Sequence, residues 1–316
     1  MPVCYTEFWF AAICGITQTN DPTLKPNYIF QNRLQYLNNI KKNALFITCL
    51  PLFFLTVFLS NCQKNNQTPV NASIACFGHA GMGSQSIYPQ NSLESVLKCY
   101  NSGADGTDLD VQITKDSVLI LFHDESLNGT SNLSGPVFEK TWSEIKTAYY
   151  TQQPNAPYPI VRLADVLSML PLKTFSLSLD CKFKNANPDK PYLDWFARQL
   201  NRVCSSQQDF SECLVESVNP YFLNHMQALN SKFKTVLYTH QFEVGSQTAI
   251  EQKFYGISMS LHEISAEQIN KAHQAALHVI VWDVSTRKQH EEALLKQPDI
   301  IQSDNVPYLV NRLSLN

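Results

Sequence analysis

The 316-residue chain has little of what marks several classes of protein. Glycine is scarce, at 10 residues, and the sequence shows no low-complexity tract or internal repeat, which argues against fibrous and repeat architectures. The net charge is only −3 and no long basic run occurs, so nothing in the charge points to a nucleic-acid partner. No two cysteines have the CxxC spacing of a zinc cluster. What remains has an ordinary hydrophobic content of 44%, in a chain long enough for one large domain or two small ones.

The nine cysteines do not form the pattern of a disulfide framework. Cys76, Cys99 and Cys181 lie in apolar strand or helix patterns, and we expect them to be buried thiols. Cys204 and Cys213 flank a polar loop, and the sequence leaves a bridge between them open.

The N-terminal part differs from the rest of the chain. Lys41 and Lys42 precede an uncharged run over 44–59, and Cys62 follows just before a polar stretch. This order is typical of an export signal, and Cys62 stands where a bacterial lipobox places its lipidated cysteine. The run is short for a spanning helix and contains Pro51, but an uncleaved membrane anchor is the alternative. Either way, we expect the rest of the chain outside the cytoplasm, in the periplasm or on the surface of a bacterium.

The part before the uncharged run is longer than an export signal requires. We interpret residues 1–40 as an upstream extension without a fold of its own, with a short helix over Tyr28–Ile40 as the alternative. The chain then divides into the extension and signal over 1–61, a linker over 62–72 and one domain over 73–316. About 255 residues follow position 61, the usual size of a single (β/α)8 barrel.

Beyond residue 73, β-rich runs alternate with amphipathic stretches, which predicts a parallel sheet. The expected strands are Ile74–Phe77, Gly106–Ile113, Val118–Phe122, Phe175–Asp180, Leu214–Ser217, Thr235–Tyr238, Gly256–Ser260, Val279–Trp282 and Ile300–Gln302. The expected helices are Ser92–Asn101, Leu163–Met169, Tyr192–Val203, Tyr221–Leu229, Ala266–Ala276, Arg287–Leu295 and Pro307–Leu313. About eight such units at this length favour an α/β fold closed into a (β/α)8 TIM barrel. The stretch 124–161 is rich in turn signals and is expected as a loop-rich insertion at the rim.

Two carboxylates share one face of an expected barrel strand. Asp108 and Asp110 alternate with Leu109 and Val111, so both acids face the opposite side from the apolar pair. They could simply face solvent at a sheet edge. If they point into the barrel, bare charges there are costly, and a divalent cation removes that cost. We therefore predict that they bind a metal.

Two histidines lie at expected strand ends, where barrel enzymes carry their catalytic residues. His79 ends the first strand and His123 ends Val118–Phe122. Imidazoles exchange protons near neutral pH, so we predict that the pair acts as general acid and base. The other histidines have no evident partner and are expected to be structural or exposed: His225, His240, His262, His273, His278 and His290.

Later strands add further candidates. Asp180 and Lys182 share one face, which fits a third metal ligand and an ammonium on phosphate oxygens, or else a buried salt bridge. Trp282 ends a late strand and either floors the substrate pocket or belongs to the core. Together these groups suit metal-assisted cleavage of a phosphate ester.

The motifs resemble those of the glycerophosphodiester phosphodiesterase family, in the same order along the chain. They are His79-Ala80-Gly81, Pro89-Gln90-Asn91-Ser92, Gly103 through Val111, Thr114-Lys115-Asp116-Ser117, His123-Asp124, Asp180-Cys181-Lys182, Trp282-Asp283-Val284 and Ser303-Asp304. The resemblance covers the chain from about Ile74 to its end.

This resemblance implies a TIM barrel with a small insertion and a bound Mg²⁺ or Ca²⁺. Carried over by position, the metal ligands would be Asp108, Asp110 and Asp180. His79 and His123 would be the acid and base. Lys182, Trp282 and Asn91 would contact the substrate.

The chain departs from the family pattern at several positions. The family arginine is Ala80, which removes a guanidinium fork from the phosphate. Two family glutamates are Asp108 and Asp180, each one methylene shorter, so the cation must shift or the backbone must approach it. Gln90 also replaces an acid. Arg162, in the insertion, is a candidate substitute for the missing guanidinium.

The expected activity is metal-dependent hydrolysis of glycerophosphodiesters to glycerol 3-phosphate and an alcohol. One alternative is a phospholipase-like phosphodiesterase that acts on a larger lipid substrate. Another is a surface lipoprotein that binds phosphodiesters without cleaving them, which the alanine at position 80 favours. The sequence does not indicate an oligomeric state.

Overall fold

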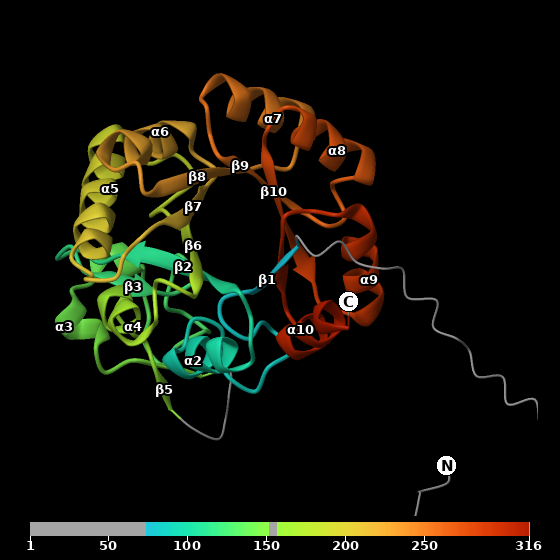
Figure 1. Ribbon diagram of the computed structural model, residues 1–316. Helices are drawn as coiled ribbons and strands as arrows, with labels where there is room; N and C mark the ends of the chain where they lie inside the picture. The colour runs from blue at the N-terminus through green and yellow to red at the C-terminus, as the bar shows by residue number, and fades with distance from the viewer. Residues whose placement is uncertain (1–73, 152–156, 316) are drawn as a thin grey trace, which may run out of the picture. The chain divides into compact units, whose positions relative to one another are not determined.

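The computed structural model describes residues 74–151 and 157–315. These residues form a closed barrel of eight parallel strands inside a ring of helices, as Figure 1 shows along the barrel axis. The predicted export signal within 1–61 and the linker 62–72 lie outside the described residues and stay predictions. Among the described helices, none combines the length and apolarity needed to cross a membrane.

The barrel strands follow one another around the barrel in chain order, and β1 pairs with both β2 and β11 to close it. The strands are β1 (Ala75–Gly78), β2 (Gly106–Ile113), β6 (Ser176–Cys181), β7 (Cys213–Ser217), β8 (Phe233–Tyr238), β9 (Gly256–Ser260), β10 (His278–Val284) and β11 (Ile300–Ser303). The helices that follow them are α2 (Leu93–Asn101), α4 (Leu163–Met169), α5 (Lys190–Ser205), α6 (Pro220–Leu229), α7 (Phe242–Glu251), α8 (Ala266–Gln274), α9 (Arg287–Lys296) and α10 (Val306–Ser314). The predicted TIM barrel is confirmed.

The barrel interior is apolar at one end and polar at the other. Phe77, Leu214, Val236, Ile280 and Ile300 form a buried cluster near the N-terminal ends of the strands. Acidic and amide side chains occupy the part nearer the C-terminal ends, where barrel enzymes place their active sites.

Strand β2 shows how the sequence produces this division. Leu109 and Val111 are buried in the large core shared with the surrounding helices. Asp108 and Asp110 alternate with them and are also buried, so they face the barrel interior, as their spacing predicts. The solvent-facing sheet edge is therefore excluded for these two acids.

One predicted barrel strand is placed differently. The segment expected as Val118–Phe122 forms β3 (Leu119–Leu121), which pairs antiparallel with the end of β2, Val111 opposite Leu121. The turn after Ile113 is only a few residues long, and so short a connection can only make a hairpin, because a parallel strand needs a long crossover. The prediction that His123 ends a barrel strand was therefore wrong. The hairpin nevertheless returns the chain to the level of Asp110, whose carbonyl accepts a hydrogen bond from the amide of Phe122 at 3.0 Å.

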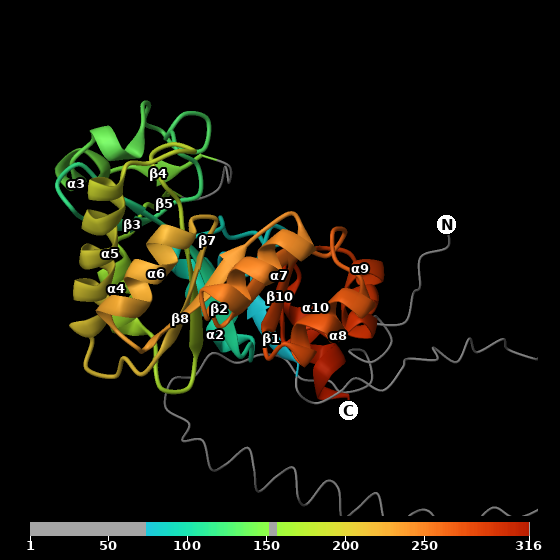
Figure 2. The same ribbon diagram turned by 90° about the horizontal axis from the view of Figure 1, so that it is seen from above.

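The insertion has a small core of its own. It contains a 3-10 turn η1 (Val137–Glu139), the short helix α3 (Trp142–Ile145) and the two-stranded pair β4 (Tyr149–Tyr150) and β5 (Tyr158–Pro159). Its buried apolar side chains cluster with those of the hairpin: Ile120, Phe122, Leu127, Val137, Ile145, Ala148, Tyr150 and Ile160. Figure 2 shows the insertion projecting beyond the barrel above α4 and α5.

Helix α7 has no counterpart among the predicted helices. Its N-cap residue Gln241 makes no side-chain capping bond, and Gly245 lies inside it, so both capping and helix propensity are weak. A Cβ atom at Gly245 would lie 2.3 Å from Cγ2 of Thr239. The glycine allows close packing on Thr239, directly after β8, and local sequence does not reveal that contact.

The described cysteines are free thiols. Cys76, Cys99 and Cys181 are buried, as predicted, and Cys204 and Cys213 are also buried and unbridged. The bridge that the sequence left open between the last two is absent.

Candidate active site

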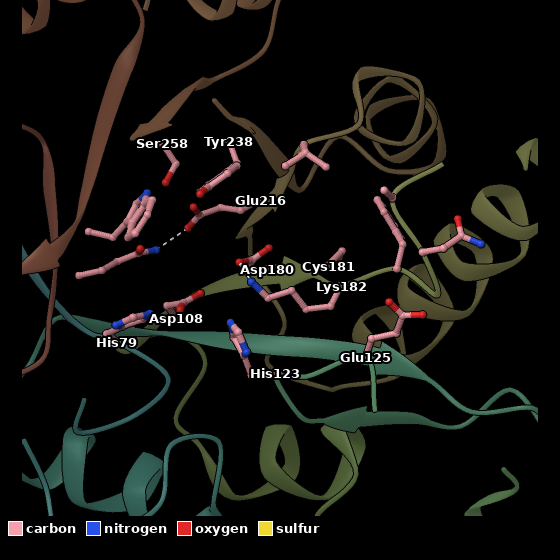
Figure 3. A pocket seen from close by; sticks show the side chains of 16 residues that line it. His79, Asp108, His123, Glu125, Asp180, Cys181, Lys182, Glu216, Tyr238 and Ser258 are labelled. Carbon is pink, nitrogen blue, oxygen red and sulfur yellow. Dashed lines mark hydrogen bonds and ion pairs between the residues drawn. The ribbon is translucent and has the colours of Figure 1, made fainter. Parts of the chain in front are cut away.

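A cavity of about 520 Å³ opens at the C-terminal ends of the barrel strands. Figure 3 shows the side chains that line it. The lining residues that carry polar chemistry are His79, Asp108, His123, Glu125, Asp180, Lys182, Glu216, Ser258 and Gln302, with Trp282 and Tyr238 as the aromatic part. Both predicted catalytic histidines therefore face one space.

His79 is held from behind by a carboxylate. Its Nδ1 atom lies 3.1 Å from Oδ1 of Asp304, which comes directly after β11. Asp304 also accepts hydrogen bonds from the amide of Ser84 at 2.8 Å and from the hydroxyl of Ser285 at 2.7 Å. Burial lowers the pKa of His79, but the contact with Asp304 and the nearby carboxylates outweigh it and raise the pKa to about 9. The same contact holds the pKa of Asp304 below its usual value.

His123 lies in a more open place. Its side chain keeps 63% of its exposure, and its Nδ1 atom lies 2.8 Å from Oδ1 of Asp124. The hydroxyl of Thr130 donates to the other oxygen of Asp124. The two imidazoles are thus each oriented by an aspartate, one partly buried and one accessible to water.

Lys182 directly follows β6 and forms ion pairs with one acid of that strand and one acid of β2. Its Nζ atom lies 2.5 Å from Oδ2 of Asp180 and 3.2 Å from Oδ1 of Asp110. Asp110 and Asp180 are register partners on β2 and β6, so the ammonium lies across that pair. Burial would lower the pKa of Lys182, but the two carboxylates raise it, and the side chain is protonated at neutral pH. The salt bridge that the sequence allowed is present.

Asn91 holds Asp110 in place and is not part of the cavity wall. Its amide nitrogen donates to Oδ2 of Asp110 at 2.6 Å, and its Oδ1 accepts from the Asp110 backbone amide at 3.0 Å. Asn91 is buried, has a positive φ of 64° and precedes Ser92, the N-cap of α2. It lies outside the set of cavity-lining residues, so a direct contact with substrate, which its motif implied, stays a prediction.

Asp108 is the least compensated acid. Its Oδ1 atom is buried and has no hydrogen-bond partner in the described part of the chain. Burial raises its pKa well above the usual range, and the charges of Asp110 and Glu216 add to this. An orphaned carboxylate oxygen that faces a cavity is the kind of group that a bound cation satisfies.

Glu216 has no counterpart among the predicted site residues. It lies on β7 in register with Asp180 and is buried. Its Oε1 accepts hydrogen bonds from Ser178 and from Nε2 of Gln302, the latter at 2.5 Å. Burial and the charge of Asp180 raise its pKa to about 7, although the hydrogen bonds lower it. On the predicted strand Leu214–Ser217, Glu216 lies on the face opposite Val215 and on the same face as Leu214. That alternation was the signal that could have placed this carboxylate inside the barrel.

The aromatic wall is formed by Trp282 and Tyr238. Their rings stack with centroids 5.5 Å apart and an interplanar angle of 25°. The indole Nε1 of Trp282 is buried without a hydrogen-bond partner among the described residues. Trp282 thus lines the cavity, and its contact with a substrate stays a prediction.

No arginine is among the residues that line the cavity in the described chain. Ala80, at the position of the family arginine, is buried at a φ of 49°. Arg162 makes a bidentate pair with Asp165 at 2.8 and 2.6 Å, and its guanidinium lies over the ring of Trp142. Because those contacts hold Arg162 at the start of α4, it does not replace the missing guanidinium.

The acids fit a hard divalent cation by their chemistry. Carboxylate oxygens are the ligands that Mg²⁺ and Ca²⁺ prefer, and the orphaned oxygen of Asp108 is available. However, no three acid, cysteine or histidine side chains between residues 74 and 315, leaving out 152–156, are arranged as a metal site. Asp110 and Asp180 instead hold Lys182. The set of Asp108, Asp110 and Asp180 as metal ligands stays a prediction.

The mouth of this TIM barrel carries carboxylates, an ammonium and two oriented imidazoles. These are the functional groups that hydrolysis of a charged ester needs. Residues 79–307 match the model of the glycerophosphoryl diester phosphodiesterase family, and the chain belongs to this family. The family resemblance of the sequence motifs is thereby confirmed.

Individual relatives agree with this assignment. A glycerophosphodiester phosphodiesterase of Bacillus altitudinis is 34% identical over 115 residues, 35% of this chain and 45% of the relative. One of Caldanaerobacter subterraneus is 23% identical over 236 residues, 73% of this chain and 95% of the relative. The chain spans less than half the length of the relatives with the higher identities. A phosphodiesterase of Oleispira antarctica, solved with the product sn-glycerol-3-phosphate, has the same fold at a TM-score of 0.68 and 17% identity, covering 76% of this chain and 96% of that one.

Proposed function

We propose that this protein hydrolyses glycerophosphodiesters to glycerol 3-phosphate and an alcohol. The observation that carries the proposal is the placement of His79 and His123 in one cavity, together with the ammonium of Lys182. Family membership supports the reaction class, and the product-bound Oleispira phosphodiesterase shares the fold.

The residues of the chain suggest how the proton transfers are divided. With a pKa of about 9, His79 is protonated at neutral pH, and Asp304 fixes its Nδ1 side, so its Nε2 proton is available for the leaving alkoxide. His123 is more accessible to water and takes the proton of the attacking hydroxyl. The attacker is water or a neighbouring glycerol hydroxyl. The Lys182 ammonium attracts the phosphate oxygens.

A divalent cation completes the proposed site. The family generally depends on one, and Asp108 with the neighbouring acids would hold it. When bound, Mg²⁺ or Ca²⁺ polarises phosphate oxygens and lowers the pKa of the attacking oxygen.

A product assay tests the proposal. The protein is incubated with glycerophosphocholine or glycerophosphoethanolamine, and released glycerol 3-phosphate is measured by a coupled dehydrogenase. We expect product with Mg²⁺ or Ca²⁺ and none after chelation, with recovery when the cation is returned. Tight substrate binding without product at any cation concentration would instead establish the binding lipoprotein that the alanine at position 80 favours.

The phospholipase alternative lacks structural support. It requires a broad apolar rim on the insertion, but the apolar side chains there are mostly buried in the insertion's own core. Among the described residues of the insertion, only Tyr149 is a large exposed apolar side chain, at 38%. Cleavage of intact phospholipid vesicles would restore this alternative.

We also propose that the protein is exported and anchored to a membrane. Lys41, Lys42, the uncharged run 44–59 and Cys62 support export and attachment to a membrane through a lipid on the cysteine. Labelling of the expressed protein with radioactive palmitate tests this, and Cys62→Ala is expected to abolish the label. Label that persists in that variant would refute the lipid anchor at Cys62.

A further inference from the structure

We propose that the cation of this enzyme is held by Asp108 and Glu216, displaced toward β7 from the Asp108, Asp110 and Asp180 set that the family motif implies. This inference rests on the proposed function, because it concerns the cation of the same site. It assigns Glu216, which no motif singles out, to the cation.

The first step in the argument is that Lys182 already compensates the acids of β2 and β6. Its ammonium contacts both Asp110 and Asp180, and Asn91 donates a further hydrogen bond to Asp110. A divalent cation between these two carboxylates would have to displace or closely approach a protonated amine, and the repulsion between like charges disfavours that position.

The second step is that Asp108 is left with an unanswered charge. It is 3% exposed, its Oδ1 has no hydrogen-bond partner in the described chain, and it lines the cavity. Among residues 74–151 and 157–315, no ion pair reaches it. A buried carboxylate without a partner is costly, and a cation relieves that cost.

The third step is that Glu216 faces the same cavity as Asp108, from two strands further around the barrel. Ser178 is the register partner of Asp108 on β6, and its hydroxyl donates to Oε1 of Glu216. Gln302 donates to the same oxygen from β11, which orients the carboxylate. Figure 3 shows Asp108 and Glu216 directed into the same space.

Two protein carboxylates are enough for such a site. Mg²⁺ in phosphate-processing enzymes is commonly held by one or two carboxylates, with the substrate phosphate and water as the other ligands. A site on Asp108 and Glu216 would also compensate for the replacement of the family glutamates by the shorter Asp108 and Asp180, because β7 supplies a longer acid.

The test measures cation binding directly. Mn²⁺ affinity is measured by electron paramagnetic resonance for the full chain and for three variants: Glu216→Gln, Asp180→Asn and Glu212→Gln. Glu216→Gln keeps an acceptor oxygen for Ser178 and Gln302, and its new amide can donate to the Ser258 hydroxyl, which faces the Glu216 carboxylate. It should therefore fold. Glu212→Gln is the matched control, because it removes one charge near the other end of β7, at a residue paired with Lys234.

We expect Glu216→Gln to weaken Mn²⁺ binding by more than about tenfold, while Asp180→Asn changes it less and Glu212→Gln leaves it unchanged. An anomalous-scattering peak for Mn²⁺ in crystals should lie between Asp108 and Glu216. Unchanged affinity in Glu216→Gln, an equal or larger loss in Asp180→Asn, or no Mn²⁺ binding by the unmodified protein would overturn the inference. Release of glycerol 3-phosphate by the unmodified protein is scored separately, so the proposed function can stand or fail independently of the cation's position.

Discussion

His79 and Asp304 are 225 positions apart in the sequence, yet Nδ1 of the histidine lies 3.1 Å from Oδ1 of the aspartate. The closure of the barrel brings them together, because β1 and β11 are neighbours and each residue directly follows its strand. A carboxylate behind an imidazole fixes the ring and favours its charged form. Asp304 is therefore a positioning residue for His79.

The first prediction concerns the pKa of His79. In Asp304→Asn, the pKa should fall from about 9 toward 6.5, its ordinary value, when followed by NMR titration in chelator. The contact stabilises the fold while the imidazole is charged and the carboxylate ionised. The loss of stability in the variant should thus be greatest between about pH 4 and 6.5 and should fade as pH rises through 9. Asp299→Asn, at the other end of the barrel, is the control and should not move the His79 titration. An unchanged pKa in Asp304→Asn would contradict the role given to this carboxylate.

The second prediction separates the two histidines proposed as acid and base from the other histidines. His79→Ala and His123→Ala should each lower kcat by about 10²–10⁴, because each removes one of the two proposed proton-transfer groups at the cavity. His273→Ala is the control, since His273 pairs with Asp299 at 2.9 Å and does not line the cavity. Initial rates of glycerol 3-phosphate release measure the effect. Full turnover by the purified His79→Ala protein would exclude its assignment.

The third prediction concerns Lys182. Lys182→Met removes the ammonium between Asp110 and Asp180 and leaves the buried carboxylate of Asp110 and the partly buried carboxylate of Asp180 facing each other. In chelator, the free energy of unfolding should fall by about 3–5 kcal/mol, measured by urea denaturation. Lys173→Met breaks a pair with Asp209 whose side chains are 70% and 51% exposed, and should cost less than about 1 kcal/mol. Equal effects of the two variants would show that the Lys182 pair does not bear on stability.

The fourth prediction compares two glycines with similar backbone angles. Gly83 has a φ of +80°, and an added Cβ would lie 2.2 Å from Cα of Asp304. Gly129 has a φ of +77°, with nothing within 4 Å of an added Cβ. Gly129→Ala should cost about 1 kcal/mol for backbone strain alone. Gly83→Ala should cost about 1–3 kcal/mol more through the clash and should also lower kcat, because it displaces Asp304 from His79. Similar unfolding free energies for the two variants would contradict this account of Gly83.

Much of the barrel could be predicted because each signal for it is local. The alternation of Asp108 and Asp110 with Leu109 and Val111 fixes which face of β2 is polar. The serine at position 92 begins α2 as its N-cap. Helix α7 was not predicted, because its capping is weak and its glycine is required only by contact with Thr239. The antiparallel direction of β3 was not predicted, because the apolar sequence of a hairpin strand looks the same as that of a parallel barrel strand.

The alternation of strands and helices and the order of the motifs were enough to predict the class of fold, the family, and the strands that carry Asp108, Asp110 and Asp180. The partners of the side chains at the site became visible only in the folded barrel. The assembled barrel placed Asp304 behind His79, Lys182 between Asp110 and Asp180, and Glu216 in the same cavity as the orphaned carboxylate of Asp108. The physical reason is that periodicity along one strand sets which face a side chain takes. The neighbours across that face come from other strands, whose order and register are fixed only when the barrel closes.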